Sequence, residues 1–521
     1  MLFKMKIGDY VGYLILLSLT ILNETSNGFK ILGVFPHAGK SHFMVFVPIL
    51  RELTRRGHEV TVISHFPETH PLPNYTDISI VGAGEIGLNN IPTSMIVNNK
   101  FRNILDHFFL GQKGAQNCEA LNYPQVQNLI RSNKTYDLII HEHFNTDCFM
   151  ALNYIFKAPN IGLSSCTMMP WLFDRFGIPN NPSYMPVNLL HYGDKMTFFE
   201  RVINTVAYFL HSYILADILM TKPADNAVKM YLGENIPSVA EIVKNTSLFL
   251  INTHYTLNRA RPYPPNVIEI SGVHLDTPKA LPSDIEKFIS ESKHGVIYFS
   301  FGSMLLGSSL RDEVKQAFMD TFRELPQRVL WKYENETLPG KPENVMIRKW
   351  MPQFDILSHP NVVGFVSHSG LLGTIEAFHN GVPIVSVPFF GDQFINAKAL
   401  ESHGTAAILD HWNLKKDSIS KALKFILQPS VLAKAKRQAR IFRDRPMSPM
   451  DTAVWWIEYV ARNGGADEMR PTVVNMPYYQ SALLDVGLFL LTVILIVVYI
   501  NYLLIKSILN KLLNRNKVKK D

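Results

Sequence analysis

The stretch VVGFVSHSGLLGTIEAFHNGVPIVSVPFFGDQ, Val362 to Gln393, carries the clearest sign of the fold. An apolar run leads into His368, a helical pattern begins after Gly370 and stops at Gly381, and a second apolar run ends shortly before Asp392. A short strand, a helix and another short strand in this order form one unit of a parallel sheet covered by helices. We therefore expect an open α/β sheet here.

The same stretch carries polar groups where such a sheet binds ligands, at the carboxyl ends of its strands. The free amides at the start of a helix favour a phosphate, and His368 and the hydroxyl of Thr374 can add donors to a diphosphate. Glu376 can accept hydrogen bonds from a ribose diol. Asp392 and Gln393 together can hold vicinal sugar hydroxyls, because a carboxylate accepts and an amide also donates.

Similar alternation extends over most of the chain. Residues 29–64 read as strand, helix and strand, with Gly57 as the helix stop, and YDLIIHE (Tyr136–Glu142) supplies another buried strand. A second series starts at GVIYFSFGS (Gly295–Ser303), after a proline-bearing segment, Asp276–Phe288, that we interpret as a linker. The fold class expected is α/β, with two tandem Rossmann-like, doubly wound domains and a cleft between them.

The two ends of the chain point to the secretory pathway. Lysines precede the apolar run Val11–Leu22, which is typical of a cleaved signal. The uncharged run Val486–Ile505 has the length of a transmembrane helix, and the basic residues after it place the tail in the cytosol and the body in the lumen. Lys517 and Lys519 resemble a dilysine retrieval signal of the endoplasmic reticulum; the alternative is that the basic tail only anchors to anionic lipid headgroups. Four sequons fit a lumenal body: Asn74, Asn133, Asn245 and Asn335.

Charge and cysteine content exclude a nucleic-acid-binding protein and a fold that depends on a framework of disulfides. The tail contributes +5 of the formal net charge of +7, so the body is nearly neutral and a nucleic-acid role has no electrostatic support. Cys118, Cys148 and Cys166 can form at most one internal disulfide, and we expect buried thiols. The expected divisions are a signal at 1–28, a first Rossmann-like domain at 29–280, a second Rossmann-like domain at 281–440, a helical segment at 441–482, a transmembrane helix at 483–505 and a tail at 506–521.

The segment Trp350–Gln393, together with SFGSM at Ser300–Met304, resembles the signature of the UDP-glycosyltransferases, the family of the lumenal UDP-glucuronosyltransferases and their insect counterparts. The resemblance implies the two-domain GT-B fold, with the acceptor bound by the domain at 29–280 and the nucleotide sugar by the domain at 281–440. The same resemblance implies a UDP-sugar as co-substrate and no separate cofactor. It also implies these donor contacts: Trp350 on uracil, Gln353 on the uridine, Ser303, His368, Gly370 and Thr374 on the diphosphate, Glu376 on the ribose, Asp392 with Gln393 on the sugar, and Arg261 near the donor.

An inverting transfer needs a base that takes the proton of the acceptor hydroxyl. His42, in the KSHF sequence, matches the catalytic histidine of the family, and His37 is the nearby rival. The family pairs its histidine with an aspartate that orients the ring. Alignment puts Glu142 at that position, which departs from the vertebrate pattern, and Asp147 is the alternative partner. The sequence leaves this choice open.

The resemblance implies transfer of a hexose to a hydroxyl of a small lipophilic acceptor, with glucose favoured and glucuronate as the other donor. No Asp-x-Asp pair is present, so we expect catalysis without a metal. The alternative is a membrane-anchored nucleotide-sugar binding protein without transfer activity, which only the Glu142 departure favours. The apolar stretch Met196–Met220 is interrupted by charges, and we expect it to lie against the membrane or over the cleft. Related lumenal proteins often form homo- or hetero-oligomers.

Overall fold

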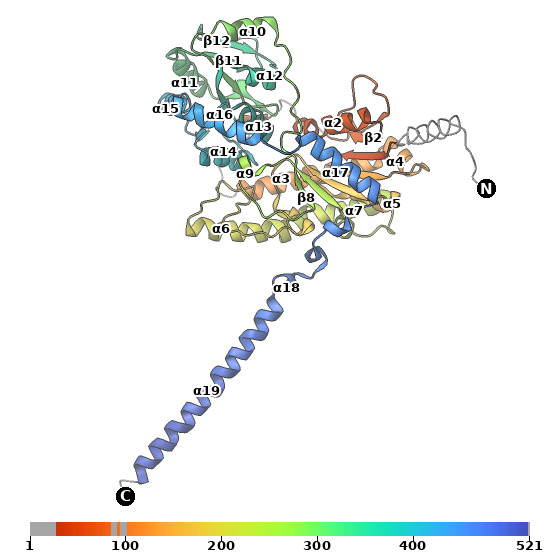
Figure 1. Ribbon diagram of the computed structural model, residues 1–521, viewed down its shortest axis with the longest axis vertical. Helices are drawn as coiled ribbons and strands as arrows, with labels where there is room; N and C mark the ends of the chain where they lie inside the picture. Colours follow the sequence, from red (N-terminus) through yellow and green to blue (C-terminus); the bar gives the residue numbers. More distant parts are fainter. Residues whose placement is uncertain (1–27, 85–90, 94–101, 519–521) are drawn as a thin grey trace, which may run out of the picture. The chain divides into compact units, whose positions relative to one another are not determined.

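The computed structural model describes residues 28–84, 91–93 and 102–518, so the expected signal, apart from Gly28, lies outside the described residues. Contacts divide the chain into two units, Met1–Arg470 and Pro471–Asp521, called here the body and the C-terminal unit. The body contains both large sheets (Figure 1).

The first sheet has seven parallel strands in the order β3-β2-β1-β5-β6-β7-β8. Its strands are rich in Val, Ile and Leu, and all five residues of β5 are buried, as expected for a strand covered by helices on both faces. The strands are β1 (Lys30–Phe35), β2 (Glu59–Ser64), β3 (Tyr75–Ser79), β5 (Leu138–Glu142), β6 (Asn160–Ser164), β7 (Leu248–Ile251) and β8 (Val267–Glu269).

Helices surround this sheet, and several follow strands directly. The α-helices are α2 (Lys40–Arg55), α3 (Arg102–Asn117), α4 (Pro124–Ile130), α5 (Ala151–Phe156), α6 (Phe198–Phe209), α7 (Lys222–Leu232) and α8 (Val239–Val243). The short helix α9 (Tyr255–Asn258) follows β7, but its buried Leu257 belongs to the core of the second sheet. Two π-helical segments, η6 (Leu210–Leu215) and η7 (Asp217–Thr221), join α6 to α7 into one long helix.

The second sheet has six parallel strands in the order β12-β11-β9-β13-β14-β15. The strands are β9 (Val296–Ser300), β11 (Arg328–Lys332), β12 (Val345–Arg348), β13 (Val362–Ser367), β14 (Ile384–Ser386) and β15 (Ala406–Ile408). The helices of this part are α10 (Ser283–Ser290), α11 (Asp312–Arg323), α12 (Gln353–Ser358), α13 (Leu371–Asn380), α14 (Gln393–Ser402), α15 (Lys416–Ile426) and α16 (Pro429–Arg443). The two sheets confirm the predicted fold class.

In both sheets the chain first winds in one direction and then crosses back to continue on the other side of the first strand. The crossing lies between β1 and β5 in the first sheet and between β9 and β13 in the second. At this crossing, the loops that follow the two neighbouring strands turn in opposite directions. The crevice between these loops is where open α/β sheets bind ligands. The fold therefore predicts a ligand site at the crossing in each sheet.

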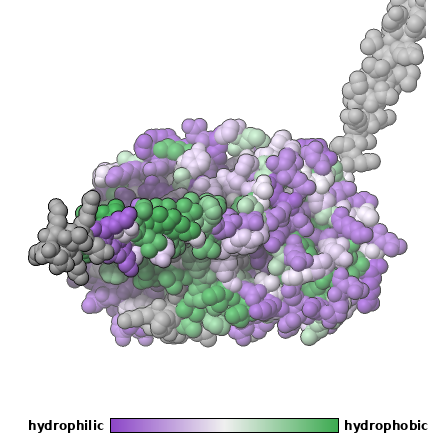
Figure 2. All heavy atoms as spheres, turned by 90° about the horizontal axis from the view of Figure 1, so that it is seen from below, coloured by the Kyte–Doolittle hydropathy of each residue, from purple (hydrophilic) through white to green (hydrophobic). Residues whose placement is uncertain are grey.

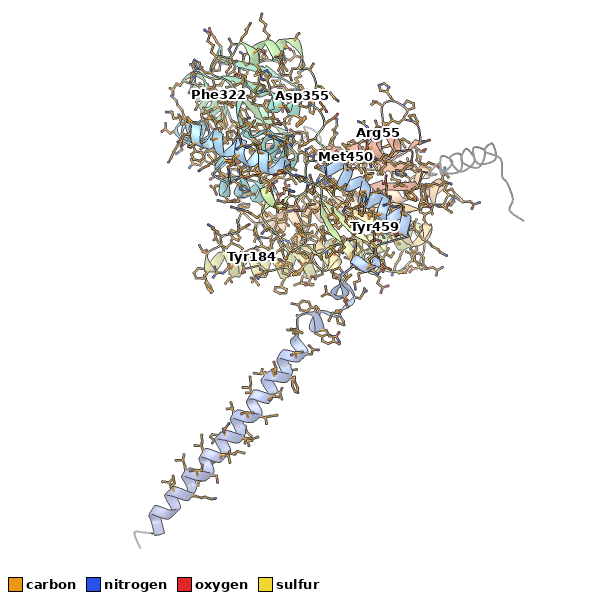
Figure 3. All side chains as sticks on the ribbon, in the orientation of Figure 1. Arg55, Tyr184, Phe322, Asp355, Met450 and Tyr459 are labelled. Atoms are coloured by element: carbon orange, nitrogen blue, oxygen red, sulfur yellow. A yellow bond between two sulfur atoms is a disulfide. The ribbon has the colours of Figure 1, made fainter. Side chains whose placement is uncertain are left out.

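Helix α17 (Pro449–Asn463) returns to the first sheet after the second is complete. Arg56, just after α2, donates to Asp451 at 2.6 Å, and the Nε2 of His58 lies 3.2 Å from Glu458. The apolar side of α17 joins the core of the first sheet; Figure 3 shows Met450, at the start of this helix, near Arg55 of α2, and Tyr459 farther along the helix. The sequence did not reveal this return, because an amphipathic helix does not say which of two cores it covers.

The interpretation of the whole segment Asp276–Phe288 as a linker was wrong. Its second half belongs to α10, whose first turn carries Asp284 and Glu286 and whose Ile285 and Ile289 are buried. Pro282 directly before this helix is compatible with it, since proline disrupts only helix interiors.

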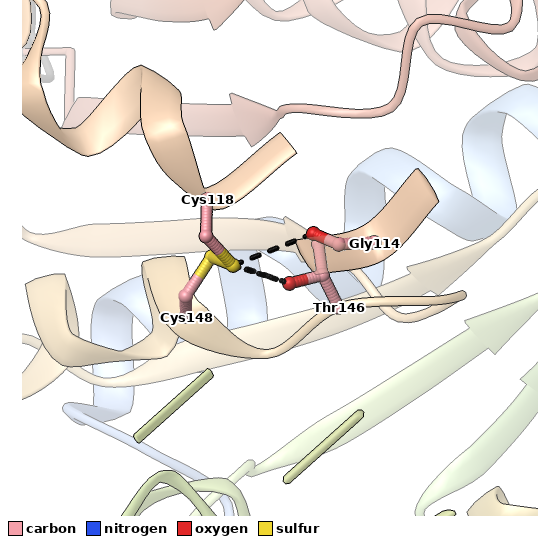
Figure 4. Close-up of a disulfide and its surroundings, with 4 residues drawn as sticks. All are labelled: Gly114, Cys118, Thr146 and Cys148. Carbon is pink, nitrogen blue, oxygen red and sulfur yellow. Dashed lines mark hydrogen bonds between the residues drawn. A yellow bond between two sulfur atoms is a disulfide. The ribbon is translucent and has the colours of Figure 1, made fainter. Parts of the chain in front are cut away.

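The expectation of three buried thiols was wrong for two of them. Cys118 and Cys148 form a disulfide that joins the end of α3 to the loop after β5 (Figure 4). The hydroxyl of Thr146 lies 3.0 Å from the Cys118 sulfur, and the carbonyl oxygen of Gly114 lies 3.4 Å from it. Cys166 remains a buried thiol. Thirty residues separate the bonded cysteines, so no local pattern announced the pair.

We expect loss of this disulfide to destabilise the body. The Cys118→Ser/Cys148→Ser variant should lose about 2–5 kcal/mol of unfolding free energy, because the bond closes a loop of this length in the unfolded chain. Denaturant unfolding with and without a reducing agent measures the loss. Cys166→Ala is the control and should keep the sensitivity to reduction; equal stability of the oxidised wild type and the double variant would contradict the prediction.

The C-terminal unit consists of the short helix α18 (Tyr478–Ser481) and the long helix α19 (Leu484–Val518). Of α19, Leu484–Leu513 is long and apolar enough to cross a membrane. The helix begins one residue from the predicted start at 483 and continues beyond 505 into the basic segment predicted as a tail.

Candidate functional site

His42 and Glu142 meet at the crossover point of the first sheet. The loop after β1 ends at Gly39, whose carbonyl oxygen accepts from the amide of His42 at 3.1 Å and so sets His42 in the first turn of α2. Glu142 is the last residue of β5, which pairs with β1. The Nδ1 of His42 lies 2.6 Å from Glu142 Oε1, with the His42 side chain 18% exposed and that of Glu142 3%. A proton on Nδ1 leaves Nε2 free to act as a base.

Two further side chains hold this pair in place. The hydroxyl oxygen of Ser165, which follows β6, lies 2.7 Å from His42 Nδ1 and 3.4 Å from Glu142 Oε1. The ring of Phe144 contacts the His42 imidazole edge to face, with 4.4 Å between centroids. Together they restrict the rotation of the imidazole.

His37, the rival base, lies beside His42 with 4.3 Å between ring centroids. Burial lowers the pKa of His37 well below its ordinary value, and the charges of His42 and His65 lower it further. No carboxylate within the described residues contacts the His37 ring. His37 is therefore a weaker base than a histidine paired with a carboxylate.

The structure does not place Asp147 beside His42. Its two carboxylate oxygens accept from the guanidinium of Arg175 at 2.8 and 2.5 Å, in a forked and largely buried ion pair. The loop between β5 and the short helix η3 (Cys148–Met150) turns Asp147 toward Arg175, whereas Glu142 stays at the strand end. Of the two partners left open by the sequence, Glu142 is the one that contacts the histidine.

On the second sheet, His368 follows β13 and packs between two glycines. A methyl group on Gly302 or on Gly370 would lie 2.5 Å from the imidazole, so only glycine leaves room for the ring at both positions. Burial lowers the pKa of His368 to about 4, with a smaller effect of Lys332. The ring is thus neutral at physiological pH, and its Nδ1 is buried without a partner among the described residues.

Glu376 and Gln353 form a pair between α13 and α12. The amide of Gln353 donates to Glu376 Oε2 at 2.7 Å. Burial raises the pKa of Glu376 to about 7, although the hydrogen bond from Gln353 lowers it in part. Trp350, three residues before α12, is 61% exposed. Such exposure of an indole leaves its face open for stacking on a planar ring.

The other residues predicted to contact a diphosphate differ in accessibility. Ser303 lies in the loop after β9, partly exposed, beside Gly302. Thr374 is completely buried, and its hydroxyl has no partner among the described residues. Ser369, not among the predicted donor residues, has a positive φ of 64° and a fully buried side chain. The sharp turn into α13 requires this backbone conformation.

Asp392 is the last residue of the loop between β14 and α14 of the second sheet. Asn396 donates to its Oδ2 at 3.1 Å, and burial raises the pKa of Asp392, opposed in part by Asn396 and by the charge of His42. The side-chain oxygen of Gln393 accepts hydrogen bonds from the backbone amides of Phe389 and Phe390, at 2.7 and 3.2 Å. Only its side-chain nitrogen therefore remains for a sugar hydroxyl. The electrostatic effect of His42 on the pKa of Asp392 indicates that these two side chains, which come from different sheets, lie near each other.

Direct contacts also join the two sheets near this point. The rings of His191 and Phe394, the residue after Gln393, stack with 3.5 Å between centroids. Strand β10 (Leu305–Leu306), just after the Ser303 loop, pairs with β4 (Ile91–Pro92) from the first half of the chain. The predicted donor loops and the first half of the chain therefore belong to one connected site.

Arg261, predicted to lie near the donor, is engaged by Asp194. Its Nη2 donates to Asp194 Oδ1 at 3.0 Å, while Nη1 is buried without a partner among the described residues. Its side chain is only 12% exposed. One guanidinium nitrogen thus remains for another acceptor.

Known proteins resemble this chain over most of its length. A family model described as UDP-glucoronosyl and UDP-glucosyl transferase matches residues 97–520. The chain belongs to this UDP-glycosyltransferase family. It is 40% identical to the UDP-glycosyltransferase UGT5 of Dactylopius coccus over 93% of both chains, and 30% identical to the mouse UDP-glucuronosyltransferase 1A7 over 90% of both chains.

Solved structures show the same fold at low sequence identity. The calicheamicin glycosyltransferase CalG4 has a TM-score of 0.53 at 16% identity, with 84% of this chain and 99% of that chain covered. LpCGTa, in complex with UDP, has a TM-score of 0.52 at 16% identity, with 84% of this chain and 99% of that chain covered. The UDP-glycosyltransferase chain thus has the GT-B arrangement of two Rossmann-like domains.

Two residues of the candidate site of this UDP-glycosyltransferase chain were missed in the sequence. Ser165 contacts both members of the His42 and Glu142 pair, and Asn396 contacts both Asp392 and the carbonyl oxygen of Ser369. Ser165 follows the strand next to β5, so the strand order would have suggested it. Asn396 lies one helical turn after Asp392, the spacing at which helical side chains meet.

Proposed function

We propose that the chain is an inverting glycosyltransferase that moves a hexose from a UDP-sugar to a hydroxyl of small lipophilic acceptors. Glucose is the favoured donor sugar and glucuronate the second candidate. The observation that supports the proposal most is the contact of His42 with Glu142, together with the electrostatic effect of His42 on the carboxylate of Asp392. A paired base from one sheet and a sugar-binding group from the other are what a direct displacement requires.

In the proposed reaction the Nε2 of His42 takes the acceptor's proton while its oxygen attacks the anomeric carbon. The bond from that carbon to the UDP oxygen breaks, and Glu142 stabilises the imidazolium that forms. The backbone amides at the start of α13 and the ring of His368 stabilise the negative charge on the leaving diphosphate. The sequence-based expectation of catalysis without a metal or separate cofactor stays part of the proposal. Asp392 and Gln393 hold the sugar hydroxyls.

The donor preference rests on the sugar-binding pair and on relatives. Asp392 and Gln393 suit neutral hydroxyls, and a relative 40% identical over 92% of this chain is named UDP-glucosyltransferase 2. A glucuronate carboxylate would need an added cation that these two residues do not supply. The alternative, a nucleotide-sugar binding protein without transfer activity, was favoured only by the glutamate at position 142 in place of an aspartate. Glu142 contacts His42, as expected of the family's aspartate, so this difference no longer favours the alternative.

Membranes from cells that express the chain test the proposal. They are incubated with lipophilic phenols and alcohols and either UDP-glucose or UDP-glucuronate, and conjugates are detected by mass. We expect glucose conjugates that are absent from membranes of cells lacking the chain. Saturable UDP binding without any conjugate would favour the binding protein, and glucuronate conjugates alone would overturn the donor preference.

We also propose that α19 spans the membrane of the endoplasmic reticulum once, with the body in the lumen. The apolar helix supports the membrane span. Two observations support a lumenal body: the disulfide, which is typical of an oxidising compartment, and the exposure of the four sequon asparagines, Asn74, Asn133, Asn245 and Asn335. Intact microsomes test it. Cleavage of the body by added protease without detergent would contradict a lumenal body.

The raised pKa of Glu376 predicts a pH effect on UDP binding. Ribose hydroxyls donate to the ionised carboxylate, so binding should release roughly half a proton at pH 7, where a group of pKa about 7 is half protonated. Affinity should rise with pH up to about 8 and then level. Titration calorimetry in buffers of different ionisation enthalpy measures the release. Glu376→Gln should bind more weakly with no proton release; release that persists in this variant would assign the effect to another group.

A further inference from the structure

The loop that follows β9 carries Ser303, which is expected at the donor diphosphate. This loop, residues 301–309, is called here the donor loop; it includes β10 and ends with the short helix η8 (Gly307–Ser309). A methyl group on Gly302 would lie 2.5 Å from the imidazole of His368, so the start of the loop packs against a second residue expected at the diphosphate. The placement of the donor loop therefore sets where Ser303 lies relative to His368.

The second sheet holds the later part of the donor loop. Leu305 is completely buried in the core of that sheet. The backbone amide of Ser308 donates to Glu334 Oε2 at 2.9 Å, and the other oxygen of Glu334 accepts from Lys332 at the end of β11 at 3.1 Å. Ser303, at the front of the loop, is partly exposed.

The first half of the chain holds the donor loop from another side. Strand β4 pairs in parallel with β10, with Ile91 opposite Leu305. The amide of Ile91 donates to the carbonyl oxygen of Met304 at 3.1 Å. Because Met304 directly follows Ser303, this hydrogen bond fixes the backbone next to the residue expected at the diphosphate.

Thr93 adds two hydrogen bonds at the end of the same loop. Its amide donates to the hydroxyl oxygen of Ser309 at 2.8 Å, and its own hydroxyl donates to the carbonyl oxygen of Ser309 at 2.8 Å. The single hydroxyl hydrogen of Ser309 points to the carbonyl oxygen of Leu306 at 2.6 Å, so the Ser309 oxygen is free to accept. These bonds and the one from Ile91 are together called the bridge.

The bridge is a core contact as well as a set of hydrogen bonds. Elsewhere apolar side chains gather in exposed patches on a mainly hydrophilic surface (Figure 2). Ile91, by contrast, packs against the hydrophobic core of the second sheet, although it comes from the first half of the chain. Separating it from this core would return apolar surface to water, which opposes opening of the bridge.

We propose that Thr93 is a positioning residue for the donor site. Together with Ile91, it holds the donor loop in the conformation in which Ser303 reaches the diphosphate of UDP. This inference rests on the proposed binding of a UDP-sugar at Ser303 and His368. Linkage between two sites is reciprocal, so UDP should stabilise the bridge as much as the bridge favours UDP. Uridine, which has no diphosphate, should do neither.

Calorimetry with the full-length chain in detergent micelles tests the proposal. Thr93→Val keeps the shape of the side chain but removes its hydroxyl, so UDP should bind roughly three- to ten-fold more weakly, the value of one hydrogen bond. Uridine should bind as tightly as to the wild type. Thr93→Ser keeps the hydroxyl and should restore UDP binding. Thr205→Val is the matched control, since it removes a hydroxyl-to-carbonyl bond of 2.8 Å within α6.

Amide hydrogen exchange measures the bridge itself. UDP should slow exchange of the amides of Ile91 and Thr93 several-fold in the wild type, and much less in Thr93→Val, which retains both amides. Uridine should not slow it. This readout needs no sugar transfer, and a merely structural role of Thr93 would not make exchange respond to the diphosphate. It also decides the matter in the wild type if Thr93→Val does not fold.

The outcomes separate this inference from the proposed function. Equal losses of UDP and uridine affinity in Thr93→Val, or unchanged affinity for UDP, would overturn the positioning role. Exchange at Ile91 and Thr93 that ignores UDP in a wild type that binds UDP would also overturn it and leave the proposed function intact. A wild type that binds no UDP would overturn both.

Discussion

His42→Ala should reduce the rate of sugar transfer by roughly 10²–10⁴-fold, the range that a positioned general base contributes. The side chain is held by Glu142 and Ser165 at 2.6 and 2.7 Å, so its removal takes away both the proton acceptor and its orientation. Binding of UDP should change less than two-fold, because the diphosphate and uridine contacts proposed here come from the second sheet. Single-turnover kinetics and calorimetry with UDP measure the two quantities.

His37→Ala is the matched control, since its ring lies beside that of His42 but contacts no carboxylate among the described residues. Its transfer rate should stay within about ten-fold of the wild type, below the range expected for a base. A His42→Ala enzyme that retains the wild-type rate would disprove the assignment of the base. A larger loss in His37→Ala than in His42→Ala would transfer the role to His37.

Glu142→Gln and Asp147→Asn should fail in different ways. Glu142→Gln keeps the shape of the side chain but removes the charge that stabilises an imidazolium at His42, so the transfer rate should fall by roughly 10²–10⁴-fold. Asp147→Asn leaves the buried guanidinium of Arg175 without its carboxylate, and breaking such a pair costs about 3–5 kcal/mol of unfolding free energy. Its rate per folded molecule should remain close to that of the wild type.

Chemical denaturation and the transfer rate, measured on the same preparations, separate the two effects. The double variant Arg175→Met/Asp147→Leu serves as the control for Asp147, because replacing both members of a buried pair removes the unpaired charge. It should recover part of the lost stability. Loss of transfer in folded Asp147→Asn, with full activity in Glu142→Gln, would reverse the assignment of the partner.

Much of the fold was predictable because it depends on local patterns. The strands around Val296, Val329 and Val362 are short apolar runs, and helices between them follow glycine turns, so a parallel α/β arrangement was expected and is found. Residues 276–288 were misread, because Pro278 and Pro282 suggested a linker and the apolar positions Ile285 and Ile289 gave too short a signal for α10.

The residues of the second-sheet site were predictable as a set because they lie within one continuous segment. Between Trp350 and Gln393 the order of residues almost fixes their order in space, since each follows or precedes a strand of the same sheet. The choice between Glu142 and Asp147 was not predictable. They are five residues apart, and the turn between them decides which one remains near His42.

The sequence alone determined the α/β class, the two series of strands, the apolar C-terminal helix and the candidate residues His42, His368, Glu376 and Asp392. These features depend on residue type and spacing within short stretches. Tertiary structure alone decided the Cys118–Cys148 bond, the partner of His42, the return of α17 to the first sheet and the pairing of β4 with β10. Each of these joins segments through contacts that depend on how whole elements pack, and packing is not encoded in any single stretch.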